Sequence, residues 1–520
     1  MKLSGLLFAA ALLGSCTQPA AEENYTRHVD PKIGTGGHGH VFVGANVPFG
    51  MVQVGPTSIP QMWDWCSGYH ASDSTVIGFS HTHLSGTGIG DLFDITVMPV
   101  VGEVTYARGE ENDPASGLWS YADRTREITK PGYYSVPLVR YGITAELTAT
   151  ERVGLHRYTF PASDAAAVVF DLENGGCWDK ATDTGFRFSD DSTRIAGWRC
   201  STGWAKDQRV YFAAEFSKPF EKFETIGDNY ARASFRTTDG EQVSLKVALS
   251  PVSVEGAREN LAAELPGWDF EETAKAADKA WNDELSKVKI TTADETARRI
   301  FYTALYHTMI APSLFCDVNG DYYGSDHAIH RNADFTNYTT FSLWDTYRAA
   351  MPLMTVLHPE KMADIVQTML TISDEQGRLP VWHLWGNETD CMVGNPGIVA
   401  VADAIVKGIG GFDREKAFEA IRKTAMNPDR GNGLRMEYGY IPCEMFNEAV
   451  AYDMEYALAD GAAARAAEAL GKAEDAKYFE ERSHSYRNYF DPATRFMRGR
   501  DSRKGWRTPF NAFASTHRAD

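Results

Sequence analysis

The chain has 520 residues and a formal net charge of -19. At roughly 150 residues per domain, this length predicts two or three domains. The negative charge repels a phosphate backbone and therefore argues against a nucleic-acid partner, whereas neutral and cationic partners remain open.

The amino terminus has the pattern of an export signal. Lys2 precedes an apolar run from Leu6 to Leu13 that is too short to span a bilayer. The following Leu13-Gly14-Ser15-Cys16 resembles a bacterial lipobox, in which Cys16 becomes the lipidated first residue; a simple cleaved signal with an incidental cysteine is the alternative. We expect residues 1–16 to be a lipoprotein signal peptide. The protein would then be exported to the periplasm or surface of a Gram-negative bacterium and touch the membrane only through its lipid anchor.

The other cysteines are widely spaced and form no C-x-x-C pair of the kind that marks a zinc or redox site. They are Cys66, Cys177, Cys200, Cys316, Cys391 and Cys443. An oxidising compartment would allow some of them to pair, but the spacing does not select the pairs.

Residues 24–265 have the pattern of a β domain. Short alternating runs occur at 144–160, 165–172, 193–200 and 242–252. Clusters of Gly, Asp, Asn and Pro separate them at the spacing found in sandwiches. We therefore predict an N-terminal β-sandwich.

The pattern then becomes helical. Phe270 to Lys287 is charged and alanine-rich, and it predicts a helical connector over residues 266–290. Beyond it, Thr292 and Glu295 match a capping box. The helix that they would open has an apolar face, whose members are Ala297, Ile300, Phe301, Ala304, Leu305 and Met309.

Further helices are predicted over residues 291–520. Pro359 opens one that Gly377 closes, with Met362, Ile365, Val366, Met369 and Leu370 on its apolar face. Pro396 opens another, with Val399, Ala402, Ile405, Val406 and Ile409, and later helices are expected near 414–426, 446–470 and 472–490. About seven helices are too few for a closed toroid of about twelve paired helices. The predicted architecture is a β-sandwich followed by an incomplete (α/α)6 toroid.

Two glycine-rich stretches carry histidine pairs. Gly34–His40 contains His38 and His40, and Phe79–Asp91 contains His81 and His83. Imidazole is a common metal ligand, so convergence of the two stretches would make a metal site; a polar surface packed on the helical domain is the alternative. The sequence GTGIGD lacks the glycine spacing of a dinucleotide fingerprint.

Three aromatic stretches are candidates for a sugar pocket. Trp63–Tyr69 (WDWCSGY) places tryptophans in a glycine-containing loop, where they would either stack on a sugar ring or belong to the sandwich core. Phe341–Arg348 (FSLWDTYR) places Asp345 at the head of a helix, as a cap or as a pocket acid.

The third stretch, Gly377–Cys391, sets Trp382 and Trp385 before Glu388 and Asp390. The tryptophans would form an apolar wall and one of the acids would bind sugar hydroxyls. Residues i and i+2 cannot bracket a glycosidic bond as an inverting pair does, so these acids are predicted to bind and not to catalyse.

Together these motifs resemble glycoside hydrolase family 92, the bacterial exo-acting α-mannosidases. The resemblance runs from Val29 to Arg500 and includes VDPKIGTGGHGHVFVGANVPFGMVQVGP, WDWCSGYH, GFSHTHLSGTGIGDLFD, FSLWDTYRA, GRLPVWHLWGNETDCMVG and FMRGR. It implies a β-sandwich followed by an (α/α)6 barrel, and a calcium ion in the active site. The active site would lie between the two domains and hydrolyse the glycosidic bond with inversion.

The resemblance also implies roles for individual residues. Trp65 and Cys66 would lie near the leaving sugar, and the terminal mannose would be surrounded by Trp344, Asp345, Asn387, Glu388 and Asp390. The family's general acid and base, and much of its calcium site, are expected beyond Asp520. We therefore expect the 520-residue chain to be inactive, with exposed apolar helix faces and poor solubility.

The expected function is calcium-assisted removal of terminal α-linked mannose from glycans. The alternatives are action on α-glucosides, a phosphorylase, and a non-catalytic glycan-binding lipoprotein of the cell surface. Linkage preference, the calcium ligands and the oligomeric state are not determined by these patterns.

Overall fold

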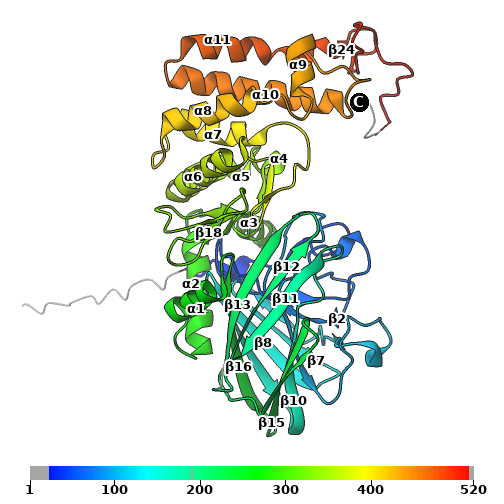
Figure 1. Cartoon of the computed structure of the whole chain (residues 1–520), viewed down its shortest axis with the longest axis vertical. Helices are drawn as coiled ribbons and strands as arrows, with labels where there is room; N and C mark the ends of the chain where they lie inside the picture. Colours follow the sequence, from blue (N-terminus) through cyan, green and yellow to red (C-terminus); the bar gives the residue numbers. More distant parts are fainter. Residues whose placement is uncertain (1–22, 189–190, 515–520) are drawn as a thin grey trace, which may run out of the picture.

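The protein has a β-rich part and a helical part, which lie at opposite ends of an elongated molecule (Figure 1). The computed structural model describes residues 23–188 and 191–514. The predicted signal peptide and Cys16 lie outside these ranges. The predicted order, a β-sandwich followed by helices, is confirmed.

Two antiparallel sheets form the sandwich. The first contains, in spatial order, β1 (Gly55–Thr57), β3 (Gly78–Ser80), β4 (Thr96–Val101), β10 (Ser163–Asp171), β15 (Tyr230–Thr237) and β14 (Lys222–Ile226). The second contains β11 (Lys180–Phe188), β12 (Arg194–Thr202), β13 (Gln208–Phe216), β16 (Glu241–Ser250), β9 (Val153–Phe160), β8 (Ile143–Ala149), β7 (Tyr133–Leu138) and β6 (Ile128–Lys130). The four alternating runs of the sequence correspond to β8 with β9, β10, β12 and β16.

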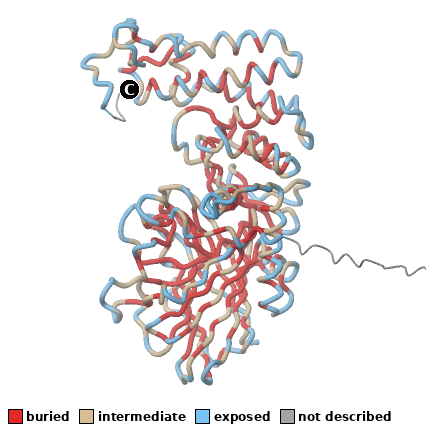
Figure 2. The backbone as a smooth tube through the Cα atoms, turned by 180° about the vertical axis from the view of Figure 1, so that it is seen from behind, coloured by how far each residue is buried: buried red, intermediate tan, exposed pale blue. Residues whose placement is uncertain are grey.

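Residues of both sheets share one core, and Figure 2 shows long buried stretches along the strands of the sandwich. Phe170 of β10 stacks on Phe212 of β13 with ring centroids 5.8 Å apart. Alternation along each strand places one set of side chains in this core, which is why the period of two predicted these strands.

A buried ion cluster also lies within the sandwich. Arg199 is fully buried, and its guanidinium reaches Asp94 at 2.6 Å and Asp179 at 2.5 Å. Two acids and the Leu172 carbonyl, which accepts from Nε at 2.9 Å, satisfy this buried cation. Such a cation is tolerated only because its partners remain in place.

Two helices connect the sandwich to the rest of the chain. α1 (Val254–Glu264) is capped by the Ser253 hydroxyl, which accepts from the Gly256 amide at 3.0 Å. The sequence prediction extended the β segment over this helix and missed it. α2 (Phe270–Leu285) confirms the predicted connector, and its fully buried Trp281 donates to the Asn46 carbonyl at 2.7 Å.

Nine helices follow the connector in the described part of the chain, more than the seven predicted. They are α3 (Glu295–His307), α4 (Leu343–Thr346), α5 (Ala350–Leu357), α6 (Pro359–Gln376), α7 (Pro396–Val406), α8 (Arg414–Ala425), α9 (Asn432–Tyr438), α10 (Ala449–Ala469) and α11 (Ala473–Arg482). The short helices α5 and α9, which were not predicted, account for the difference. The longer helices stack in layers away from the sandwich, and α10 packs on α7, α8 and α11 (Figure 1).

The prediction for α3 was wrong in its cap and partly wrong in its buried face, of which Leu305 and Met309 are buried. Asp294, not Thr292, caps the helix by accepting from the amides of Thr296 and Ala297. Ile300 is 54% exposed, whereas Tyr302, Thr303, Leu305 and Tyr306 are buried.

The prediction for α6 is confirmed throughout. Pro359 is its first residue, all five predicted apolar residues are buried, and Gly377 follows the helix with φ of 92°. The face predicted for α7 is partly wrong, because Val406 is 50% exposed while Ile398 and Val401 are buried. The last predicted helix, 472–490, ends early, at Arg482.

No helix among the described residues combines the length and the apolar character that crossing a membrane requires.

Candidate functional site

A cavity of about 380 Å³ lies where the sandwich meets the helical part. The sandwich contributes the loop Ser85–Thr87, which belongs to the second glycine-rich stretch. The helical part contributes Asp345 at the head of α4, Trp382, and His307 at the end of α3. The cavity is also lined by Thr308, Ile310, Ala311, Pro312, Thr340, Ser342, Thr346, Ala350 and Met351.

The glycine-rich stretches and the tryptophan loop meet at the sandwich rim of this cavity. The Gly86 amide donates to the His40 carbonyl at 2.7 Å. The exposed Trp63 donates through Nε1 to the Gly88 carbonyl at 2.7 Å. Segments distant in sequence therefore build one rim, as the metal hypothesis required, although the four histidines form no group of potential metal ligands within the described ranges.

The four histidines have separate surroundings. The His40 ring packs edge-on against Trp63, with ring centroids 4.2 Å apart, and its Nε2 lies 3.7 Å from Asp64. His38 lies 2.6 Å from Asp64. Inside the sandwich, His81 Nδ1 contacts the Ile95 carbonyl at 2.6 Å, and His83 Nδ1 contacts the Gln53 carbonyl at 2.7 Å. Burial lowers the pKa of His81 to about 4 and that of His83 to about 3, which keeps both rings neutral.

Asp345 is the sole acid among the residues that line the cavity. It is exposed, and its Oδ2 accepts from the Ser342 hydroxyl at 2.6 Å. Ser342 lies in the strand β21 (Phe341–Ser342), which pairs with β22 (Trp382–Leu384) and so holds α4 beside Trp382. This carboxylate can accept hydrogen bonds from a ligand in the cavity.

His307 lines the same cavity and was missed by the sequence prediction. Its Nε2 is buried and has no hydrogen-bond partner among the described residues. Burial lowers the pKa of His307 to about 4, so the ring is neutral near pH 7. Its helical position resembles that of any core histidine, so no pattern in the sequence could have singled it out.

The acids Glu388 and Asp390 do not line the cavity. Glu388 accepts from the amides of Val381 at 2.7 Å and Trp382 at 2.9 Å, and from the Asp390 amide at 2.9 Å. Asp390 pairs with Arg378 and lies 3.5 Å from Arg430. Both acids hold together the loop that follows α6.

Asn387 and the two tryptophans join the domains. Asn387 is 5% exposed and donates to the carbonyls of Asp207 and Trp385. Trp385, predicted to form an apolar wall of the pocket, is buried with its ring centroid 5.1 Å from that of Phe315, and it does not line the cavity. Trp382 is also buried but lines the cavity. Trp344, also predicted to contact sugar, is half-buried against the sandwich core.

The first two predicted sugar contacts lie away from the cavity lining. Trp65 is buried, donates to Asp73 at 2.7 Å and stacks on His70 at 4.4 Å. Cys66 is fully buried. The exposed tryptophan of this loop is Trp63.

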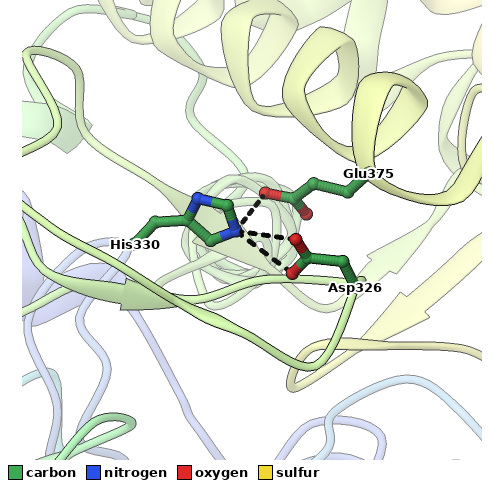
Figure 3. Close-up of side chains that lie close together, drawn as sticks. All are labelled: Asp326, His330 and Glu375. Atoms are coloured by element: carbon green, nitrogen blue, oxygen red, sulfur yellow. Dashed lines mark hydrogen bonds and ion pairs between the residues drawn. The ribbon is translucent and has the colours of Figure 1, made fainter.

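One group of three potential metal ligands occurs among the described residues: Asp326, His330 and Glu375, with ligand atoms within 4.8 Å of one another (Figure 3). His330 Nε2 lies 3.1 Å from Asp326 Oδ1 and 3.3 Å from Glu375 Oε1. Calcium takes six to eight oxygen ligands, and the imidazole nitrogen does not suit it. The group instead links the hairpin of β18 (Tyr322–Tyr323) and β19 (Ile329–His330) to α6, and the calcium ligands stay unassigned.

A larger cavity, of about 760 Å³, lies between the amino-terminal segment, the sandwich and α2. None of the predicted site residues lines it. The smaller cavity between the domains is therefore the better candidate site.

The described residues thus form a two-part protein: a β-sandwich joined by two helices to a helical array, with a polar and aromatic cavity where the parts meet. Two family models match this chain: the glycosyl hydrolase family 92 N-terminal domain over residues 28–250 and the family 92 catalytic domain over residues 256–520. The chain belongs to glycosyl hydrolase family 92.

Solved structures of the family share this fold. The family GH92 α-mannosidase BT3965 of Bacteroides thetaiotaomicron, in complex with mannoimidazole, is 39% identical with a TM-score of 0.90, and the match covers 94% of this chain and 67% of that one. The inverting mannosidase BT2199 of the same bacterium is 28% identical with a TM-score of 0.85, covering 95% and 69% of the two chains. A curated relative, the uncharacterized secreted glycosidase of Arthroderma benhamiae, is 26% identical over 555 aligned positions, covering 95% of this chain. The chain spans 66% of the length of that relative.

Proposed function

We propose that this protein is an exo-α-mannosidase. It would remove terminal α-linked mannose from glycans, with inversion at the anomeric carbon and with the help of calcium. Membership in family 92 supports this proposal, as do the relatives described as α-mannosidases, one of them in complex with mannoimidazole and another as inverting. Calcium would supply positive charge that helps to hold and distort the terminal sugar.

The cavity between the domains carries the proposal. Asp345 would accept hydrogen bonds from sugar hydroxyls, and the neutral His307 would form a further hydrogen bond with the sugar. Trp382 would offer an apolar face to the sugar ring. Inverting glycosidases hold two carboxyl groups about 6.5–9.5 Å apart. Because Asp345 is the only acid in the lining, its role here is binding.

The other predicted contacts would act through the loop that they hold. The segment after α6 would be held in place by Asn387, Glu388 and Asp390. Trp344 would hold the first turn of α4 against the sandwich core. Trp65 and Cys66 would support the Trp63 loop at the sandwich rim, on the side of the leaving sugar.

Calorimetric titration with methyl α-mannoside tests the binding role. Replacing Asp345 with Asn removes a charged acceptor, which is worth about 1.5–3 kcal/mol, so we expect affinity to fall by at least about tenfold. Asp429→Asn makes the same change at an exposed position outside the cavity lining and should leave the affinity unchanged. Equal affinity of wild type and Asp345→Asn would contradict the proposal.

Hydrolysis is tested separately. The resemblance places the acid and base beyond Asp520, so residues 1–520 should bind mannose without releasing it from an α-linked mannobiose. Calcium-dependent release by this polypeptide would show instead that its own residues supply the acid and base.

Export and lipid anchoring through Cys16 complete the proposal. The description of the curated relative as secreted supports export. Cells fed labelled palmitate should label the wild-type protein and not Cys16→Ser; equal labelling of both would refute the anchor.

A further inference from the structure

Two cysteine-bearing turns of the sandwich pack against the same glycine-rich segment, 88–90. One is the turn η2 (Trp63–Trp65), which Cys66 follows directly. A Cβ atom at Gly88 would lie 2.5 Å from the Trp63 ring. The Trp63 ring therefore lies directly against residue 88, which has no side chain.

The second turn contains Cys177. The Trp178 amide donates to the Gly90 carbonyl at 3.3 Å. A Cβ atom at Gly90 would lie 2.6 Å from the Cβ of Cys177. The sequence GTGIGD, which is no nucleotide fingerprint, thus has a packing role: the turn that precedes Cys66 and the turn that contains Cys177 both pack on it.

The side chains of Cys66 and Cys177 interact, and this interaction is the largest influence on the pKa of each thiol. Cys66 is fully buried, whereas Cys177 is half-buried and so reachable from solvent. The hydrogen bond from Cys66, with Arg108 nearby, lowers the pKa of Cys177, while the same contact and burial raise the pKa of Cys66. Cys177 is therefore the thiol that ionises first and attacks.

We propose that Cys66 and Cys177 form a disulfide when the chain meets a disulfide oxidant, such as an exported dithiol oxidase or oxidised glutathione. The Cys177 thiolate attacks a sulfur of the oxidant and displaces one thiol. Cys66 then loses its proton and attacks the Cys177 sulfur of the mixed disulfide, displacing the second thiol. The two cysteines lose two protons and two electrons, and the oxidant's disulfide becomes two thiols.

This bond would tie the Trp63 turn to the turn before β11. Trp63 is bonded to Gly88, next to the loop Ser85–Thr87 that lines the cavity between the domains. The disulfide would therefore stiffen the sandwich rim of that cavity. It closes a loop of more than about 100 residues, for which chain entropy predicts a large stabilisation.

Peptide mapping tests the bond directly. The folded chain is incubated with oxidised glutathione, then unfolded and alkylated without reductant and digested with trypsin. We expect peptide 33–108, which contains Cys66, to be joined to peptide 158–180, which contains Cys177, and the two to separate on reduction. Alkylation of both cysteines, or their linkage to other cysteines, would overturn the proposal.

Variants provide the controls. Cys66→Ser and Cys177→Ser should each abolish the linked peptide, whereas Cys200→Ser, at another half-buried thiol, should retain it. Oxidation should raise the Tm of wild type by several degrees and leave that of Cys66→Ser unchanged. The mapping on wild type decides the question even if a variant fails to fold.

Discussion

Replacing Asn387 with alanine tests whether this side chain couples the two domains. Its amide nitrogen donates to the Asp207 carbonyl at 3.0 Å and to the Trp385 carbonyl at 2.8 Å, and its oxygen accepts from the Asp207 amide at 3.0 Å. Asp207 directly precedes β13 of the sandwich, whereas Asn387 belongs to β23 (Asn387–Glu388) of the helical part. The change removes two hydrogen bonds across the boundary and one within the loop.

The expected loss follows from these contacts. At about 1 kcal/mol net for each hydrogen bond, three lost bonds cost about 3 kcal/mol. The folded fraction relative to the unfolded one should fall on the order of a hundredfold. Calorimetry, and urea unfolding followed by tryptophan fluorescence, would measure this loss. In the variant we expect the sandwich and the helical part to unfold in two separate transitions.

Asn319→Ala is the matched control. Asn319 also has three hydrogen bonds, to Glu259 and Asp321, but it is exposed, so water replaces them and the loss should stay below about 1 kcal/mol. Equal losses in the two variants would refute the coupling role. Unchanged stability with weaker mannoside binding would make Asn387 a sugar contact instead.

Three further predictions concern buried charge and metal. Arg199→Met leaves two buried acids without their cation and should cost about 3–5 kcal/mol in urea unfolding; Arg194→Met, at a 62% exposed side chain, should cost under about 0.5 kcal/mol. Burial raises the pKa of Asp91 to about 6, above roughly 3.9 in the unfolded chain. The folded state therefore holds the proton more tightly, and stability should fall by up to about 3 kcal/mol as pH rises from about 4 through 6; Asp91→Asn should flatten this dependence, and an unaltered slope would contradict it. The imidazole nitrogen of His330 does not suit calcium, so His330→Ala should leave any calcium-induced rise in Tm as large as in wild type. Loss of that rise in Tm would assign calcium to the group of Asp326, His330 and Glu375.

The predictions that succeeded depend on interactions within a few residues. The start, apolar face and end of α6 follow from Pro359, an apolar stripe and Gly377, all of which act within one helix. The buried face predicted for α3 was only partly right, because a distant partner decides which residues of this helix are buried. Tyr25 lies 5.4 Å from Tyr302, and the Thr303 hydroxyl accepts from the Asp30 amide at 2.9 Å. The spacing of apolar residues within α3 carries no information about these contacts with the amino-terminal segment.

The same distinction explains the candidate site. A mixture of acids and tryptophans predicted a sugar pocket near residues 382–390, but composition does not distinguish an acid that holds its own loop from one that faces a ligand. Glu388 is bound by backbone amides only a few residues away, and Trp382, which lines the cavity, also packs against Trp204 of the sandwich, with ring centroids 4.6 Å apart. Asp345, by contrast, is bonded only locally to Ser342 and faces a cavity completed by the loop Ser85–Thr87. The packing of the two domains thus decides which acid faces the cavity. The sequence around each acid does not reveal how the domains pack.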